Sequence, residues 1–122
     1  MYKKVLITGA EGFIGSHLTE FLLKKKYKIR ATSLYNFMGS NGWLDNLNLK
    51  KNKNIEIIQG DITDEKFAKL ITKNIDVVIN LSALIGIPYS YKSPKSYINN
   101  NIIGTHNLLE SSVEHKVKKF IQ

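Results

Sequence analysis

A short apolar run near the N-terminus leads directly into three evenly spaced glycines and then into a helical pattern. Residues 5–7 are apolar, and the glycines are Gly9, Gly12 and Gly15. A strand that turns sharply into a helix offers free backbone N–H groups and the positive end of the helix dipole to a phosphate. Here Gly9 permits the turn, Gly12 leaves room for the phosphates, and Gly15 lets the helix approach the sheet. The pattern therefore predicts a site for a dinucleotide pyrophosphate.

The composition is that of one globular domain. Of the 122 residues, 43% are hydrophobic, and the chain has no cysteine. This excludes a disulfide framework and a thiolate metal site, and no two histidines have the spacing of metal ligands, so we expect no metal. No apolar run reaches the length of about 18 residues that spans a bilayer, and the first residues lack a secretory h-region. We therefore expect no membrane partner and a cytoplasmic location.

The formal charge of +8 comes mostly from lysines in short runs at 24–26, 50–53 and 116–119. These runs fall at expected helix ends and in loops, where cations are solvated and complement the helix dipole. A nucleic-acid surface would concentrate arginines and aromatic residues on one face. We therefore expect no nucleic-acid partner; the weaker alternative, a basic nucleic-acid-binding protein, would show binding that depends steeply on salt.

Apolar runs and helical patterns alternate along the whole chain. The sequence predicts strands at residues 3–8, 27–34, 55–59, 76–81 and 118–121, and helices at 13–26, 64–73 and roughly 94–115. A short helix is expected near residues 43–49 and a loop before residue 94. The apolar face of the first helix is assigned to Phe13, Ile14, Leu18, Phe21 and Leu22. This order predicts the α/β class, with a doubly wound parallel sheet of the Rossmann type that stops after about five strands.

Further motifs follow the glycine motif in a specific order. They are Gly60-Asp61-Ile62-Thr63-Asp64 after the third expected strand, Asn80-Leu81-Ser82-Ala83 after the fourth, and Asn101-Ile102-Ile103-Gly104-Thr105 in the last helix. Together they resemble the extended short-chain dehydrogenase/reductase family, which includes NAD-dependent nucleotide-sugar epimerases and dehydratases. Residues 35–45 and 84–91 are similar to UDP-N-acetylhexosamine 4,6-dehydratases of nonulosonic acid synthesis, such as that of legionaminic acid.

The resemblance assigns roles to residues of all these motifs. It implies that the pyrophosphate is held by Gly9, Gly12, Phe13, Ile14 and Gly15, that the adenine is contacted by Asp61 and Ile62, and that the ribose and nicotinamide lie along Leu81, Ser82 and Ala83. It also implies that the loop after the fourth strand faces the sugar of a nucleotide sugar through Ile85, Pro88 and Tyr89. Plainer readings stay open: Gly60-Asp61 is also a common turn with a helix cap, Ser82-Ala83 could only close a strand, and Tyr89 could be an ordinary loop aromatic.

The choice between NAD and NADP depends on the end of the second strand. An acidic side chain about 20 residues after the glycines holds the ribose hydroxyls of NAD. In this chain Ser33 aligns with that position, and Arg30 lies three residues before it. A serine with a nearby arginine would tolerate the 2′-phosphate of NADP, whereas the resemblance favours NAD. The sequence leaves both cofactors open.

The chemistry of the resembled family requires a Tyr-x-x-x-Lys pair on a helix after the fifth strand. One literal match is present, Tyr91 and Lys95, but Pro94 lies between them and is poorly tolerated inside a helix. We therefore expect no catalytic residue in this chain. Residues 1–122 are expected to be the N-terminal part of an NAD(P)-binding domain, with the catalytic strand and helix and the substrate domain absent.

The function implied by the resemblance is that of the cofactor-binding half of a nucleotide-sugar 4,6-dehydratase or epimerase. In such enzymes a hydride passes from C4 of the sugar to the nicotinamide and later returns. The complete enzyme would take a UDP-N-acetylhexosamine and could be a homodimer, whereas this chain alone is expected to bind cofactor without turnover. The alternative is a non-catalytic dinucleotide-binding sensor or partner module.

Overall fold

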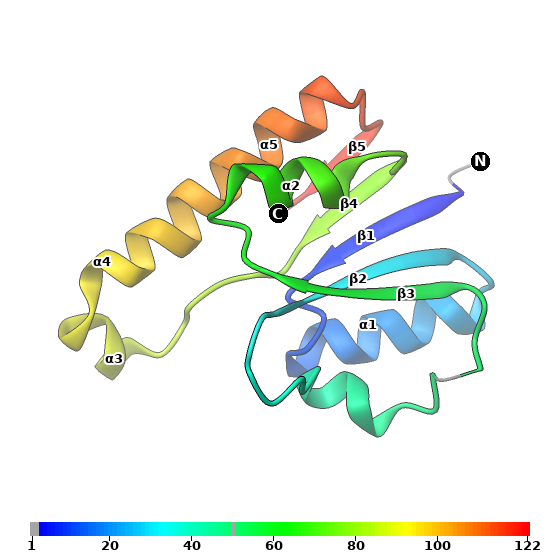
Figure 1. The fold of residues 1–122 in the computed structure, drawn as a ribbon, viewed down its shortest axis with the longest axis horizontal. Coiled ribbons are helices and arrows are strands. Elements are labelled where there is room, and N and C mark those ends of the chain that lie inside the picture. Colours follow the sequence, from blue (N-terminus) through cyan, green and yellow to red (C-terminus); the bar gives the residue numbers. More distant parts are fainter. Residues whose placement is uncertain (1–2, 50) are drawn as a thin grey trace.

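The computed structural model describes residues 3–49 and 51–122, and it contains one parallel sheet (Figure 1). Its five strands are arranged in the order β3-β2-β1-β4-β5, and every neighbouring pair is parallel. The strands are β1 (Lys4–Thr8), β2 (Lys28–Leu34), β3 (Ile55–Gly60), β4 (Val77–Asn80) and β5 (Lys119–Ile121). The predicted α/β class and the doubly wound parallel sheet are confirmed.

Helices cover both faces of the sheet (Figure 1). Helix α1 (Phe13–Lys24) and the short 3-10 helix η1 (Gly42–Asn46) lie on one side, and α2 (Glu65–Thr72) and α5 (Thr105–Glu114) lie on the other. Helices α3 (Ile87–Lys92) and α4 (Pro94–Tyr97) follow β4, and the π-helical segment η2 (Ile98–Gly104) joins α4 to α5. No helix in the described part of the chain is both long enough and apolar enough to cross a bilayer.

The core is divided in two by the sheet, because successive side chains of a strand point to opposite faces. On β1, Val5 and Ile7 pack into the cluster beneath α1, whereas Leu6 packs on the opposite face with Ile71 of α2 and Leu108 of α5. All three β1 side chains are at most 3% exposed. This explains why the central strands are continuous apolar runs rather than alternating ones.

Helix α1 packs differently from the predicted pattern. Phe13, Ile14 and Phe21 were expected on its buried face, but they are 62%, 69% and 55% exposed. The residues buried on this helix are Gly15, Ser16 and Thr19, while Leu18 and Leu22 are partly buried against the core as predicted. Small side chains face the sheet because the helix approaches the glycine loop closely, and this rotates the large residues of the first turn outward.

The segment after β4 contains more helix than expected. Residues 87–92 were expected in a loop, but they form α3, in which Pro88 occupies the first turn, where proline is tolerated. The expected helix at 94–115 is present as α4, η2 and α5, which run on from one another (Figure 1). Its middle is π-helical, an arrangement often found at functional positions.

Candidate functional site

The glycine loop lies at the point where the sheet reverses its direction of growth. From β1 the chain extends to β2 and β3 on one side and later to β4 and β5 on the other. Gly9 follows β1 directly and has φ +64°, in the left-handed region that favours glycine. A Cβ at Gly9 would also lie 2.7 Å from the backbone of Leu81 and Ser82. Both the turn and the close approach of the loop after β4 therefore require glycine.

The other two glycines have different surroundings. A Cβ at Gly15 would collide with the carbonyl oxygen of Gly9 and lie 2.7 Å from Cα of Ala10, so α1 packs directly on the glycine loop. A Cβ at Gly12 would meet only the Gly9 oxygen, at 3.4 Å, and Gly12 has an ordinary φ of −75°. Gly12 immediately precedes α1 and lines a cleft, so its lack of a side chain leaves space in front of the helix N-terminus.

That cleft collects most of the predicted site residues. Its walls come from the glycine loop, the ends of β2 and β3, the loop after β4 and one residue of η2. The lining residues are Gly9, Glu11, Gly12, Thr32, Ser33, Leu34, Gly60, Asp61, Ile62, Leu81, Ser82, Ala83, Leu84 and Asn100. Eight of the residues assigned to the cofactor are among them: Gly9, Gly12, Ser33, Asp61, Ile62, Leu81, Ser82 and Ala83.

The remaining assigned residues lie outside the lining. Phe13 and Ile14 are exposed in the first turn of α1, and Gly15 is buried behind the loop. Ile85, Pro88 and Tyr89 are on the loop after β4 and on α3; Ile85 is 84% and Tyr89 51% exposed. The structure therefore groups the residues assigned to the cofactor and leaves those assigned to the substrate on a separate, open segment.

Asp61 does not cap the helix that follows it. Its Oδ1 accepts hydrogen bonds from the Thr63 amide at 2.8 Å and the Thr63 hydroxyl at 2.7 Å. The N-cap of α2 is instead Asp64, which accepts from the Phe67 amide at 2.8 Å. Of the alternative interpretation, a turn with a helix cap, the turn is present at Asp61, but the cap is Asp64. The carboxylate of Asp61 lies on this exposed turn at the edge of the cleft.

Ser33 is held in a network that fixes the loop after β2. Its hydroxyl donates to Oδ1 of Asn41 at 2.9 Å, and Nε2 of Gln59 donates to the same oxygen at 3.1 Å. Asp45 accepts from the Asn41 amide at 2.8 Å, and this backbone hydrogen bond is the largest cause of the lowered pKa of Asp45. Ser33 is only 2% exposed, and its hydroxyl already donates its proton to Asn41, so it has no proton left to donate to a ligand.

Arg30 points away from the cleft. Its Nη1 donates to the carbonyl oxygens of Ile71 at 2.7 Å and Lys73 at 2.8 Å, at the C-terminal end of α2. Its Nε pairs with Glu56 at 2.6 Å. Arg30 thus satisfies carbonyl groups that the helix leaves unpaired. The suggestion that it serves a 2′-phosphate does not fit this geometry.

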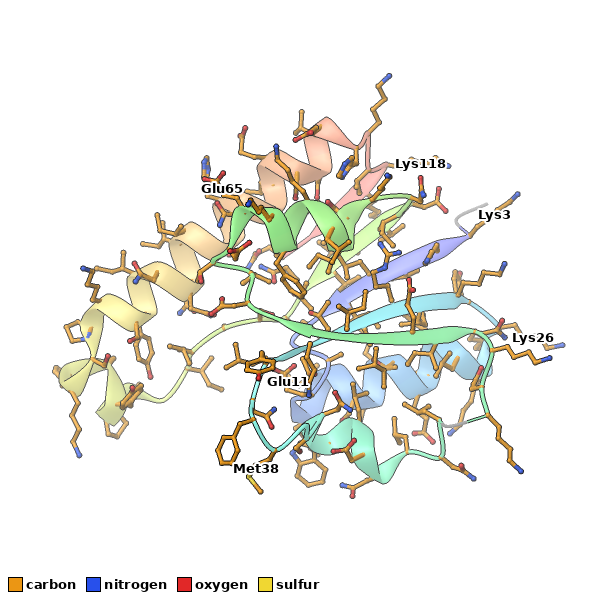
Figure 2. All side chains as sticks on the ribbon, in the orientation of Figure 1. Lys3, Glu11, Lys26, Met38, Glu65 and Lys118 are labelled. Atoms are coloured by element: carbon orange, nitrogen blue, oxygen red, sulfur yellow. The ribbon has the colours of Figure 1, made fainter. Side chains whose placement is uncertain are left out.

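Glu11 lines the cleft, although no role was predicted for it from the sequence. One carboxylate oxygen, Oε1, accepts from the Leu34 amide at the end of β2, at 3.1 Å. Figure 2 labels Glu11, which lies where the chain passes from β1 to α1. The only signal in the sequence is an acid within the glycine motif of a chain that lacks one at the end of its second strand. Leu84 and Asn100, also unassigned, complete the wall on the β4 side.

These features fit a dinucleotide. The cleft lies outside the carboxyl ends of parallel strands at a switch point, and Gly12 leaves the helix N-terminus open to it. A Rossmann-type dinucleotide-binding protein is the class that this fold and this site define.

A family model described as GDP-mannose 4,6 dehydratase matches residues 6–122, and the chain belongs to this family. The chain is 38% identical over 98% of its length to a dTDP-D-glucose 4,6-dehydratase of Dictyostelium discoideum. It is 35% identical over 96% of its length to a UDP-glucose 4-epimerase of Halalkalibacterium halodurans. The chain spans only 28% and 33% of these two relatives.

Solved structures share the fold over nearly the whole chain. Pen from Bacillus thuringiensis aligns with a TM-score of 0.87 and 30% identity, over 98% of this chain and 37% of that one. WbmH of Bordetella bronchiseptica, solved in complex with NAD+, aligns with a TM-score of 0.77 and 25% identity, over 98% of this chain and 38% of that one. The resemblance to dehydratases and epimerases that act on nucleotide sugars is therefore confirmed at the level of the family.

Proposed function

We propose that this chain is the NAD(P)-binding part of a nucleotide-sugar 4,6-dehydratase or epimerase. The observation that carries the proposal is the single cleft in which the glycine loop, the end of β2, Asp61 and the segment 81–84 meet. The first-turn amides of α1 would hold the pyrophosphate, and Asp61 would accept from the adenine amino group. Ser82 and Ala83 would lie along the ribose and nicotinamide.

The chemistry of the complete enzyme would come from a bound nicotinamide, which accepts a hydride from C4 of the sugar and returns it. In this chain the residues of the cleft bind and orient that group. Relatives named as a 4,6-dehydratase and a 4-epimerase support either reaction. Within this range we propose a UDP-N-acetylhexosamine as the substrate, as in the dehydratases of nonulosonic (legionaminic) acid synthesis. This proposal rests on the similarity of residues 35–45 and 84–91 to those enzymes.

We also propose that the chain alone has no turnover. Tyr91 lies in α3 and Lys95 in α4, and Ser93 separates the two helices with φ −140°. Helix α4 begins at Pro94, which lies between the two residues and supports the proposal. Tyr91 and Lys95 therefore do not share a helix face, and no other Tyr-x-x-x-Lys spacing occurs in the sequence.

The segment after β4 is proposed to bind the sugar. Ile85, Pro88 and Tyr89 would face it, and Tyr89 packs against Tyr97 with ring centroids 6.1 Å apart.

In the complete enzyme α5 would contribute to a homodimer. Its exposed Leu109 and Val113 support this, because large apolar side chains on one helix favour a covering partner.

The proposal is tested by titration calorimetry of the chain with NAD, NADP and a UDP-sugar in parallel. We expect one dinucleotide to bind, the UDP-sugar to give little heat, and Gly12→Asp to abolish dinucleotide binding while the circular dichroism spectrum is unchanged. Glu20→Gln, on the solvent side of α1, is the control that should bind as the wild type does. A folded wild-type chain that binds neither dinucleotide would refute the proposal.

A further inference from the structure

Glu11 is the acid that the second strand lacks. In dinucleotide-binding folds the ribose hydroxyls are held by a carboxylate at the end of the second strand. Residues 32–35 of this chain contain none. The carboxylate of Glu11 reaches the same end from the glycine loop, because its Oε1 accepts from the Leu34 amide at 3.1 Å. A carboxylate is thus present at this place in the fold but comes from a different segment.

The second oxygen of this carboxylate is unusual. Oε2 of Glu11 is buried and has no hydrogen-bond partner in the described part of the chain. A buried carboxylate oxygen without a donor is costly, so natural structures almost always satisfy one. Two nearby backbone amides are already used, since the Gly42 amide donates to the Ser40 hydroxyl and the Trp43 amide donates to the Glu11 carbonyl. Glu11 also lines the cleft, and a turn of its side chain would bring the carboxylate to a donor on a ligand bound there.

Two other side chains near the end of β2, Ser33 and Arg30, could contact the ribose hydroxyls or a 2′-phosphate, but both already bind other parts of the protein. The Ser33 hydroxyl donates to Asn41, and Arg30 is bound to the end of α2. Among the described residues that line the cleft there are two carboxylates, Glu11 and Asp61, and no lysine or arginine. A phosphate group on the ribose would meet negative charge with no cation to balance it.

We infer that Glu11 binds the ribose hydroxyls of the adenosine half and makes the cleft selective for NAD over NADP. This inference rests on the proposed function. A hydroxyl donor would complete the hydrogen bonding of Oε2, whereas a 2′-phosphate would bring further negative charge against a partly buried carboxylate.

The test compares NAD and NADP affinities of the wild type, Glu11→Gln and Glu20→Gln by titration calorimetry. Glutamine keeps an acceptor for the Leu34 amide but removes the charge, so the loop should stay in place. We expect the wild type to bind NAD at least about tenfold more tightly than NADP, and Glu11→Gln to reduce that ratio by about tenfold, the size expected for one charged hydrogen bond. Glu20→Gln removes one partly exposed charge from α1, outside the lining of the cleft, and should keep the wild-type ratio.

A second measurement does not depend on the folding of the variant. Wild-type protein should bind 2′-deoxy-NAD about tenfold more weakly than NAD, because this ligand lacks the donor. Equal or tighter binding of NADP by the wild type would overturn the inference, and so would an unchanged ratio in Glu11→Gln. In both cases dinucleotide binding, and with it the proposed function, would stand. A wild-type chain that binds neither dinucleotide would refute both.

Discussion

Gly12 and Gly15 belong to one motif, but the structure separates their roles. A side chain at Gly15 would press on backbone atoms of the glycine loop that cannot move independently. A side chain at Gly12 would meet no atom closer than 3.4 Å and would enter the cleft. One glycine therefore serves the packing of α1, and the other serves the space in front of it.

We predict that Gly15→Ala lowers the free energy of unfolding by about 1–2 kcal/mol. Overpacking costs about 1–3 kcal/mol, and the upper end, about 2–3 kcal/mol, applies here because a Cβ at Gly15 meets only backbone atoms. Alanine offsets about 1 kcal/mol of this through its higher helix propensity. Urea denaturation followed by circular dichroism measures the change. Gly12→Ala is the matched control and should keep its urea midpoint within error while losing dinucleotide affinity. A Gly15→Ala protein with the urea midpoint of the wild type would contradict the prediction and show that the glycine loop shifts to make room for the added methyl group.

At the level of elements, the sequence predicts the strands better than the segments around the cleft. All five strands were predicted within a few residues. For β1 and β4 the reason is that a run buried on both faces is almost entirely apolar. Helix α3 was missed because none of its six residues is buried, so it carries no apolar period. The π-helical turn has no pattern of its own. Its position follows from packing, since Gly104 lies against Ile62 so closely that a Cβ would come within 2.7 Å.

Some residues of the candidate site could be predicted from the sequence, and others could not. The resemblance assigned Gly9, Gly12 and Asp61 to one cofactor, and the structure places all three on one cleft. Gly9 and Asp61 directly follow β1 and β3, whose carboxyl ends lie at one edge of the sheet, and Gly12 immediately precedes α1. The role of Glu11 could not be predicted, because it depends on a contact with Leu34, 23 residues further along the chain. The sequence left open whether Arg30 serves a phosphate for a related reason: only the packing of α2 against the sheet shows that its side chain binds the end of that helix.

Asn101 connects the π-helical segment to the wall of the cleft. Its Nδ2 donates to the Leu84 carbonyl at 2.9 Å, and its Oδ1 accepts from the Leu84 amide at 2.9 Å. This pair of bonds holds the loop after β4 as a neighbouring strand would. We predict that the Leu84 amide hydrogen exchanges at least about tenfold faster in Asn101→Ala than in the wild type. The reason is that the variant loses two hydrogen bonds of about 1 kcal/mol each.

Amide hydrogen exchange measured by NMR checks this prediction. Asn99→Ala is the control, since Asn99 is exposed in the same segment. We expect the control to leave the Leu84 amide protected and Asn101→Ala to weaken dinucleotide binding as well. Equal protection in both variants would mean that the loop is held by its own packing.

At the scale of the whole molecule, one end of the sheet forms the cleft and the other end holds strands together. The cleft occupies the C-terminal ends of the strands, whereas Asp76 joins three strands at the other end. Its carboxylate accepts from the Lys3 amide at 2.7 Å, the Lys4 amide at 3.0 Å and Nζ of Lys118 at 2.7 Å. Lys3 and Lys118 lie at the same end of the sheet, away from Glu11 (Figure 2). The edge strand β5 is thereby tied to β1 and β4 by a residue remote from the ligand.

We predict that Asp76 makes stability depend on pH without affecting binding. The Lys118 hydrogen bond, followed by those of the Lys3 and Lys4 amides, holds the pKa of Asp76 well below the usual carboxyl value of about 3.9. A folded-state pKa below the unfolded value adds stability above that usual value and loses it as the pH falls further. Asp76→Asn should therefore have a lower urea midpoint than the wild type at pH 7, and the gap should shrink progressively below about pH 4. Glu110→Gln, on the exposed face of α5, should show no such convergence, and NAD affinity at pH 7 should be equal in all three proteins. A gap that stays constant with pH would assign the effect of Asp76 to packing rather than to its charge.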